Sequence, residues 1–223
     1  MELELLPCVE LGPRQADYSI IWLHGLGANG HDFEPIVPEL QLPQDANIRF
    51  VFPHAPSRPV TINAGMVMPA WYDILAPAFD LAEDDAGIRQ SQQQLERLIG
   101  REVERGVRTE HIVLAGFSQG GAIALHTGLR YSHRLAGIMA LSCYLPLAAS
   151  LQAEASRHNR EVPVFMAHGT HDPIVPLRLA ENSRQQLEQL GYQIEWHSYE
   201  MEHSVCAEEI RDIGRWLRKV FDL

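Results

Sequence analysis

The sequence predicts an α/β fold in which a mainly parallel sheet is covered by helices on both faces. Two observations lead to this prediction. Short apolar runs of strand length alternate with longer segments of helical periodicity along all 223 residues. The strand runs are apolar nearly throughout, as expected of strands buried on both faces. No internal repeat or linker interrupts the alternation, so residues 1–223 are predicted to form a single domain.

The elements can be assigned in order along the chain. Predicted strands cover 3–11, 18–23, 48–52, 111–114, 135–141, 163–167 and 192–199, the first as a partly alternating edge strand. Predicted helices cover 32–40, 83–105, 122–129, 177–190 and 205–221. In the first helix Pro35 is tolerable only in the first turn, and acids at the start of the second helix suit its macrodipole. Gly191 ends the fourth helix.

A long stretch from His54 to about Leu81 has no regular pattern. It contains four prolines, so we expect it to be irregular rather than one element. Loops of this length in compact domains are usually functional or disordered, and this one is too apolar for disorder. The sequence therefore predicts that the loop packs against the body of the protein or against a ligand.

Composition excludes several classes of protein. With a net charge of −11, the chain lacks the basic surface that nucleic acids and anionic membranes require. The three cysteines, Cys8, Cys143 and Cys206, are far apart and have no metal-ligand spacing, which is typical of reduced thiols in a cytoplasmic protein. The first residues carry acids where a secretory signal carries bases, and no apolar run is long enough to span a bilayer.

One candidate nucleophile stands in the sequence Gly-Phe-Ser-Gln-Gly, between a predicted strand and a predicted helix. This context is the one required of a nucleophile elbow, a sharp and strained turn. Gly116 and Gly120 provide the small residues that such a turn needs. The turn would lift the Ser118 hydroxyl out of the backbone over the start of a helix. The alternative is a glycine-rich turn with an incidental serine.

A serine hydroxyl needs an adjacent base, and the base needs an orienting acid. In the layout that goes with such an elbow the chain order is serine, acid, histidine, so we expect the acid after a later strand and the histidine after the last one. Asp172 lies in the loop after 163–167, and His203 lies between the last predicted strand and helix. Asp212 and Asp222 are rival acids, although both come after any plausible base. The alternatives are an aspartate that only shapes a turn and a histidine on a surface loop.

Two further features concern metals and oxyanion stabilisation. His168 and His171 form an H-x-x-H pair, but no third ligand is evident, so no metal is expected. Oxyanion stabilisation requires two backbone N–H groups. The residue after the nucleophile, Gln119, should supply one, and Leu26 in the early glycine loop should supply the other. A glycine turn that merely feeds a helix is the alternative for the second.

The combined motifs resemble the phospholipase/carboxylesterase family of α/β-hydrolases, which includes acyl-protein thioesterases, and most closely its small bacterial carboxylesterases. The resemblance rests on 24–27 (HGLG), 53–56 (PHAP), 71–73 (WYD), 116–121 (GFSQGG), 168–176 (HGTHDPIVP) and 203–204 (HS). It implies an α/β-hydrolase fold, Ser118, Asp172 and His203 as a triad, Leu26 and Gln119 as oxyanion donors, no cofactor, and a cytoplasmic location. The chain departs from the family at 63–65 (NAG) and at Tyr72, both near the acyl-binding loop.

The leading functional hypothesis is a serine carboxylic-ester hydrolase that forms an acyl-enzyme on short to medium acyl esters. An acyl-protein thioesterase or a lysophospholipase is an alternative, because the attacking chemistry is shared. A non-enzyme alternative is an inactive hydrolase fold that acts as a binding module. The expected partner is a small ester or acyl thioester, and a homodimer is a further possibility. The acyl group would contact Met66, Met68, Trp71 and Leu75 on the long loop, with Trp71 as a rigid wall.

Overall fold

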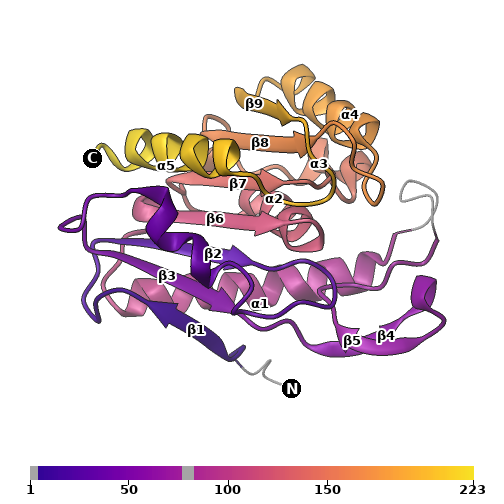
Figure 1. The fold of residues 1–223 in the computed structure, drawn as a ribbon, viewed down its shortest axis with the longest axis horizontal. Helices are drawn as coiled ribbons and strands as arrows, with labels where there is room; N and C mark the ends of the chain where they lie inside the picture. Colours follow the sequence, from indigo (N-terminus) through magenta and orange to yellow (C-terminus); the bar gives the residue numbers. More distant parts are fainter. Residues whose placement is uncertain (1–4, 77–82) are drawn as a thin grey trace.

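A computed structural model describes residues 5–76 and 83–223, and its centre is a mainly parallel sheet. In spatial order the sheet runs β1 (Cys8–Leu11), β3 (Ile48–Pro53), β2 (Tyr18–Leu23), β6 (Ile112–Phe117), β7 (Gly137–Leu141), β8 (Val164–Gly169) and β9 (Ile194–Tyr199) (Figure 1). Only the edge strand β1 pairs antiparallel within this sheet, as far as the described residues show. The predicted fold class is confirmed.

Helices cover the two faces of the sheet. They are α1 (Asp85–Glu104), α2 (Gln119–Arg130), α3 (Ala148–Glu154), α4 (Leu177–Gln189) and α5 (Ala207–Phe221), with short 3₁₀ helices η1 (Glu34–Leu40), η2 (Thr61–Asn63), η3 (Thr109–His111) and η4 (Arg157–Asn159). Buried side chains of α1 to α4 share one core cluster, and those of α5 and η1 share the other. Figure 1 shows α5 and α1 on opposite sides of the strands.

The period-two alternation of β-strands divides the apolar residues between these two cores. In β2, Ile21 and Leu23 face the α1 and α2 side, whereas Ile20 and Trp22 face the α5 side. Both sets are buried, which explains why the strand reads as a continuous apolar run in the sequence. Because the strands are parallel, the carboxyl ends of β2, β6, β8 and β9 meet at one edge of the sheet, where ligands bind in such folds.

The long stretch from 54 to 81 differs from its prediction. It contains a hairpin of β4 (Ser57–Val60) and β5 (Met66–Pro69), closed through η2, where an irregular loop was expected. Prolines are tolerated here because both strands of a two-stranded hairpin are edge strands. A missing backbone N–H therefore removes few of the hydrogen bonds between the strands. Residues 77–82 of this prediction lie outside the described residues.

Three other expectations need correction. The helix predicted over 32–40 is the tighter η1, and Pro38 inside it lacks the N–H that an α-helix would use. The edge strand predicted over 3–11 begins only at Cys8, and residues 3 and 4 lie outside the described residues. Helix α3 was not predicted, because seven residues are too few to establish a helical period. Within the described residues, no helix is both long and apolar enough to cross a bilayer.

Glu209 is a buried acid on α5, directly after the loop that carries His203. Burial raises its pKa to about 8, and the Cys206 backbone N–H offsets this only in part. Unfolding exposes the carboxyl to water and returns its pKa to about 4.5. Between these two values the folded protein therefore holds a proton that the unfolded chain has released.

We predict that the free energy of unfolding falls as the pH rises from about 5 to 8, by on the order of 1 kcal/mol per pH unit from this group. Glu209→Gln, which mimics the protonated form, should remove that fall, whereas the exposed neighbour substitution Glu208→Gln should retain it. Urea unfolding at several pH values measures the slopes. Equal slopes in Glu209→Gln and the wild-type protein would contradict the assignment.

Candidate active site

Ser118 lies at the sharp turn between β6 and α2, with φ 54° and ψ −123°. This is a positive-φ conformation that a residue with a side chain rarely adopts. The turn is possible because backbone passes close to backbone. A Cβ on Gly116 would lie 2.3 Å from the carbonyl carbon of Gly120, and a Cβ on Gly120 would lie 2.5 Å from the carbonyl oxygens of Leu23 and His24. Both glycines are therefore fixed by packing, and the turn holds Ser118 at the carboxyl edge of the sheet.

Ser118, His203 and Asp172 form a continuous chain of hydrogen bonds. The Nε2 atom of His203 lies 2.9 Å from Ser118 Oγ, and its Nδ1 atom lies 2.7 Å from Asp172 Oδ2. An ionised carboxylate can only accept, so the proton of the neutral imidazole is on Nδ1. Nε2 is then left with a lone pair directed at the serine hydroxyl, which is the arrangement that a general base requires.

Asp172 is held by more donors than His203 alone. Its Oδ1 atom accepts the backbone N–H groups of Ile174 and Val175, each at 2.8 Å. His168 Nε2 lies 2.8 Å from the Val175 carbonyl oxygen and 3.3 Å from Asp172 Oδ2, so it must carry the proton and can donate to both. Burial raises the pKa of Asp172, but the hydrogen bonds from His168, His203 and Val175 outweigh burial and hold that pKa well below its usual range.

The loops that carry the acid and the base are tied to each other. The Thr170 N–H donates to the Tyr199 carbonyl at 2.8 Å, and the His171 N–H donates to the Met201 carbonyl at 3.1 Å. The ring of Phe117, next to the serine, packs on the imidazole of His203 with centroids 4.7 Å apart. The bonds between the loops and the Phe117 ring together limit the freedom of the imidazole to turn away from Ser118.

The early glycine loop, residues 24–27, runs beside the serine. A Cβ on Gly25 would lie 3.4 Å from the Cβ of Ser118, so the two backbones are adjacent. Among the described residues, the backbone bonds of this loop run from Gly27 N–H to the Pro69 carbonyl and from Ala28 N–H to the Gly25 carbonyl, leaving Leu26 N–H uncommitted. Gln119 is the first residue of α2, so its N–H has no partner within the helix. Gln119 thus directly follows Ser118, and Leu26 directly follows Gly25, which lies beside Ser118.

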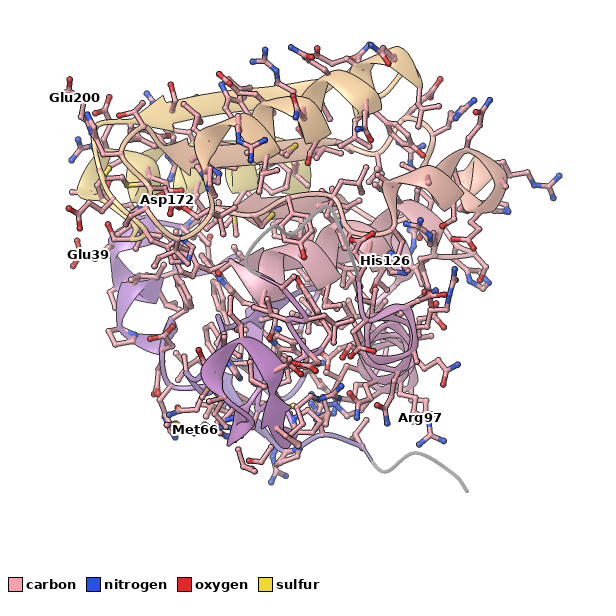
Figure 2. All side chains as sticks on the ribbon, turned by 90° about the vertical axis from the view of Figure 1, so that its right-hand side faces the viewer. Glu39, Met66, Arg97, His126, Asp172 and Glu200 are labelled. Carbon is pink, nitrogen blue, oxygen red and sulfur yellow. The ribbon has the colours of Figure 1, made fainter. Side chains whose placement is uncertain are left out.

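The four predicted acyl contacts are not equivalent. Figure 2 looks onto this edge of the sheet, with Met66 on the β4–β5 hairpin and Asp172 across the face from it. Met66 is 64% and Leu75 41% exposed. Met68 is half-buried, and its sulfur is the nearest atom to a Cβ built on Gly27, at 3.8 Å. The expectation that Trp71 forms a wall of the acyl site is wrong, because its side chain is only 1% exposed and packs in the core.

The H-x-x-H pair does not converge on a metal site. The His168 ring is buried and bonded to Val175 and Asp172, whereas the exposed His171 contacts the hydroxyl of Thr170. Within residues 5–76 and 83–223, no three histidine, cysteine or carboxylate side chains are arranged so that they could hold a metal ion. The H-x-x-H pattern suggests only a metal ligand at His168, and its contact with Asp172 leaves no signal in the sequence.

The rival acid Asp212 is used elsewhere. It accepts the Tyr199 hydroxyl at 2.7 Å and a short hydrogen bond from Arg215, both on the α5 side of the sheet. His197, the other histidine that follows the acid loop in the sequence, lies inside β9 and stacks on Phe165. Asp222 is the exposed residue that ends α5.

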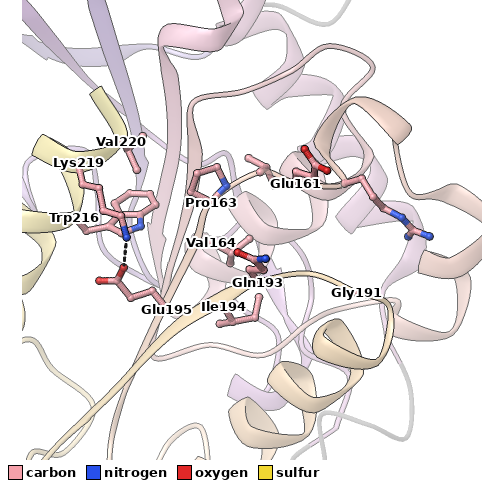
Figure 3. A pocket seen from close by; sticks show the side chains of 12 residues that line it. Glu161, Pro163, Val164, Gly191, Gln193, Ile194, Glu195, Trp216, Lys219 and Val220 are labelled. Carbon is pink, nitrogen blue, oxygen red and sulfur yellow. Dashed lines mark ion pairs between the residues drawn. The ribbon is translucent and has the colours of Figure 1, made fainter. Parts of the chain in front are cut away.

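A cavity of about 800 Å³ lies at the other end of the sheet, where β8 and β9 begin (Figure 3). Its apolar floor includes Val164, Ile194 and Trp216, and a Lys219–Glu195 ion pair borders it. Because parallel strands point away from this end, the cavity is separated from Ser118 by the length of the sheet. The reactive side chains therefore lie at the opposite edge.

Comparisons with known proteins find relatives along nearly the whole chain. The phospholipase/carboxylesterase family profile matches residues 6–221. Acyl-protein thioesterase 1 of Neurospora crassa is 41% identical over 208 residues, covering 89% of this chain and 85% of the relative. Acyl-protein thioesterase 1 of Gibberella zeae is 38% identical over 224 residues, covering 96% and 95%.

The solved structure of Zea mays acyl-protein thioesterase 2 superimposes with a TM-score of 0.86 at 27% identity, covering 96% of this chain and 99% of the other. The family match extends over residues 6–221, a range that contains the loops around Ser118. The protein is therefore an ester or thioester hydrolase of the α/β-hydrolase fold, and the chain belongs to the phospholipase/carboxylesterase family.

Proposed function

We propose that this protein is a serine hydrolase that cleaves acyl esters and thioesters through an acyl-enzyme on Ser118. The observation that carries the proposal is the chain of hydrogen bonds from Ser118 through His203 to Asp172, at 2.9 and 2.7 Å. Carboxylic esters were the first expectation from the sequence. The names of the relatives fit the thioesterase alternative better, so acyl-protein thioesters are the physiological substrate that we propose.

In the proposed reaction, His203 Nε2 accepts the proton of the Ser118 hydroxyl as Oγ attacks the acyl carbonyl carbon. The tetrahedral intermediate collapses, the bond to the alcohol or thiol breaks, and the leaving group takes the proton from His203. Water then repeats the sequence on the acyl-enzyme and releases the carboxylic acid and the free serine. Asp172 remains ionised throughout and stabilises the transient imidazolium, in keeping with its depressed pKa.

We further propose that the backbone N–H groups of Leu26 and Gln119 bind the oxyanion. Gln119 follows Ser118 in the chain and Leu26 follows Gly25, whose backbone is adjacent to Ser118, and neither N–H is required for a bond within its own segment. Donors that are already in place stabilise the developing charge without reorganisation. No cofactor is required in this scheme, and a single domain over 1–223, a cytoplasmic location and a homodimer remain predictions from the sequence.

The acyl group is proposed to lie along the β4–β5 hairpin. Met68 contacts the glycine loop that presents Leu26, and Met66 and Leu75 extend the apolar surface outward. Ile62 and Val67 on the same hairpin are also exposed. Methionine side chains adapt to chains of different length, and each buried methylene adds ~0.8 kcal/mol at most.

Ser118→Ala should abolish turnover of esters and thioesters and leave the fold intact, because the attacking oxygen is removed. Loss of a triad member typically leaves only a residual ~10³–10⁴-fold acceleration over water. Ser142→Ala is a matched control, since Ser142 also follows a strand, β7, with positive φ (48°). Assays on acyl thioesters and p-nitrophenyl esters measure the effect. Near-normal rates in Ser118→Ala would refute the proposal, and an inactive wild-type protein would favour the binding-module alternative.

Asp172→Asn should keep the local geometry but remove the charge that stabilises the imidazolium. The comparable change in a serine protease lowers kcat by about 10⁴-fold. Asp212→Asn, a substitution of the rival acid, should have little effect because Asp212 binds Tyr199 on the α5 side. Steady-state kinetics of both variants provide the comparison. A silent Asp172→Asn beside an inactive Asp212→Asn would show that the acid is misassigned.

In a series of esters with increasing acyl length, kcat/KM should rise over a few carbons and then level off. Met66→Ser with Met68→Ser should flatten the rise and leave acetate ester hydrolysis much less affected. Val103→Ser is the control, because Val103 is an exposed apolar side chain on α1. If the double variant and the wild-type enzyme gave the same slope, the hairpin would not bind the acyl group.

A further inference from the structure

Segment 69–72, which begins at the last residue of β5, contacts both chain segments that present the proposed oxyanion donors. These two segments are the glycine loop 24–27 and the start of α2 at Gln119. They are more than ninety residues apart in the sequence, so the spacing of their N–H groups is set only by tertiary contacts. Four hydrogen bonds join segment 69–72 to them.

Two of these bonds hold the glycine loop on either side of Leu26. The indole N–H of Trp71 donates to the His24 carbonyl at 2.8 Å, and the Pro69 carbonyl accepts the Gly27 N–H at 2.8 Å. Leu26 lies between these two attachment points. Gly27 has a φ of +77°, so the loop follows a path that few residues prefer, and attachment on both sides fixes it.

The other two bonds hold the side chain of Gln119. The Trp71 backbone N–H donates to its Oε1 atom at 2.8 Å, and its Nε2 atom donates to the Tyr72 carbonyl at 2.6 Å. The Gln119 side chain is buried, where the low dielectric strengthens such bonds. The side-chain amide thereby accepts one backbone hydrogen bond from segment 69–72 and donates another to it, as the backbone of an adjacent strand would.

Segment 69–72 is itself fixed to the body of the protein. The Trp71 carbonyl accepts a short hydrogen bond from the Ser91 hydroxyl on α1. The Tyr72 hydroxyl lies 3.1 Å from that of Tyr144, and both Trp71 and Tyr72 are buried in the core shared by α1 and α2. The segment is therefore held in place and can in turn hold the glycine loop and the Gln119 side chain.

We propose that the Trp71 indole N–H and the Gln119 side-chain amide are positioning groups that set the separation of the Leu26 and Gln119 backbone N–H groups. The inference rests on the proposed function, since it concerns the oxyanion of that reaction. Oxyanion donors must lie within about 2.7–3.1 Å of the charge they stabilise, and a misplacement of about 1 Å can cost ~10²-fold in rate. Trp71 and Gln119 act through the backbone and do not contact the reacting atoms.

The test compares Trp71→Phe with Trp22→Phe. Both tryptophans are 1% exposed, and each substitution removes the same atoms from a core. The indole N–H of Trp22, however, has no hydrogen-bond partner among the described residues, so only Trp71→Phe removes one of the two attachments of the glycine loop. We expect kcat of Trp71→Phe to fall about 10- to 100-fold with KM within about twofold, and Trp22→Phe to stay near the wild-type kcat.

A second variant and a second measurement keep the test decisive. Gln119→Met preserves the backbone N–H and the side-chain length but loses both amide bonds, and it should show the same split between kcat and KM. Affinity for a trifluoromethyl ketone, which forms an oxyanion adduct on serine, should fall by the same factor as kcat/KM. If Trp71→Phe does not fold, as judged by its circular dichroism, Gln119→Met alone carries the test.

Three results would overturn the inference. They are a wild-type kcat in the variants at Trp71 or Gln119, an equal loss in Trp22→Phe, or a change confined to KM. Failure of the proposed function looks different, because the wild-type enzyme would then hydrolyse neither esters nor thioesters and would not respond to Ser118→Ala. In that case both the proposed function and the positioning role are refuted. An active wild-type enzyme with an unaffected Trp71→Phe variant excludes only the positioning role.

Discussion

The close approach of backbone to backbone at the serine turn is the constraint on which the rest of the site depends. A Cβ on Gly116 or Gly120 would lie within 2.3–2.5 Å of neighbouring backbone atoms, so the end of β6, the start of α2 and the end of β2 meet without side chains between them. This contact places Ser118 directly beside the glycine loop. It also commits the protein to a positive φ at Ser118, a strained conformation that the surrounding sheet and helix stabilise.

The remaining parts of the site are arranged around that turn by hydrogen bonds between loops. The loop after β8 binds the loop after β9, which brings Asp172 and His203 together on one side of Ser118. On the other side, segment 69–72 binds the glycine loop and Gln119. Each loop is therefore held by a neighbour from a distant part of the sequence. The reactive atoms are preorganised by these contacts more than by the local rigidity of any one loop.

The sequence predicted the sheet and the meeting of Ser118, Asp172 and His203, because buried strands are apolar throughout and chain order limits which loops share an edge. Features set by contacts between distant residues were missed. Trp71 is apolar and lies in a proline-rich stretch, so nothing local distinguishes a substrate wall from a buried donor to His24. The contact between His168 and Asp172 was missed likewise, because in the sequence His168 belongs to an H-x-x-H pattern that suggests a metal site. The β4–β5 hairpin was not predicted because prolines are typical of loops and are rare in strands.

The most direct test of the account is to trap the acyl-enzyme. The wild-type protein would be mixed with an acyl thioester, quenched in acid within milliseconds, and analysed by intact mass and peptide mapping. We expect a mass increase of one acyl group, located on the peptide that contains Ser118, which disappears as hydrolysis is completed. Acylation of Cys206 or another residue, or thioester hydrolysis in which no covalent adduct forms, would contradict it.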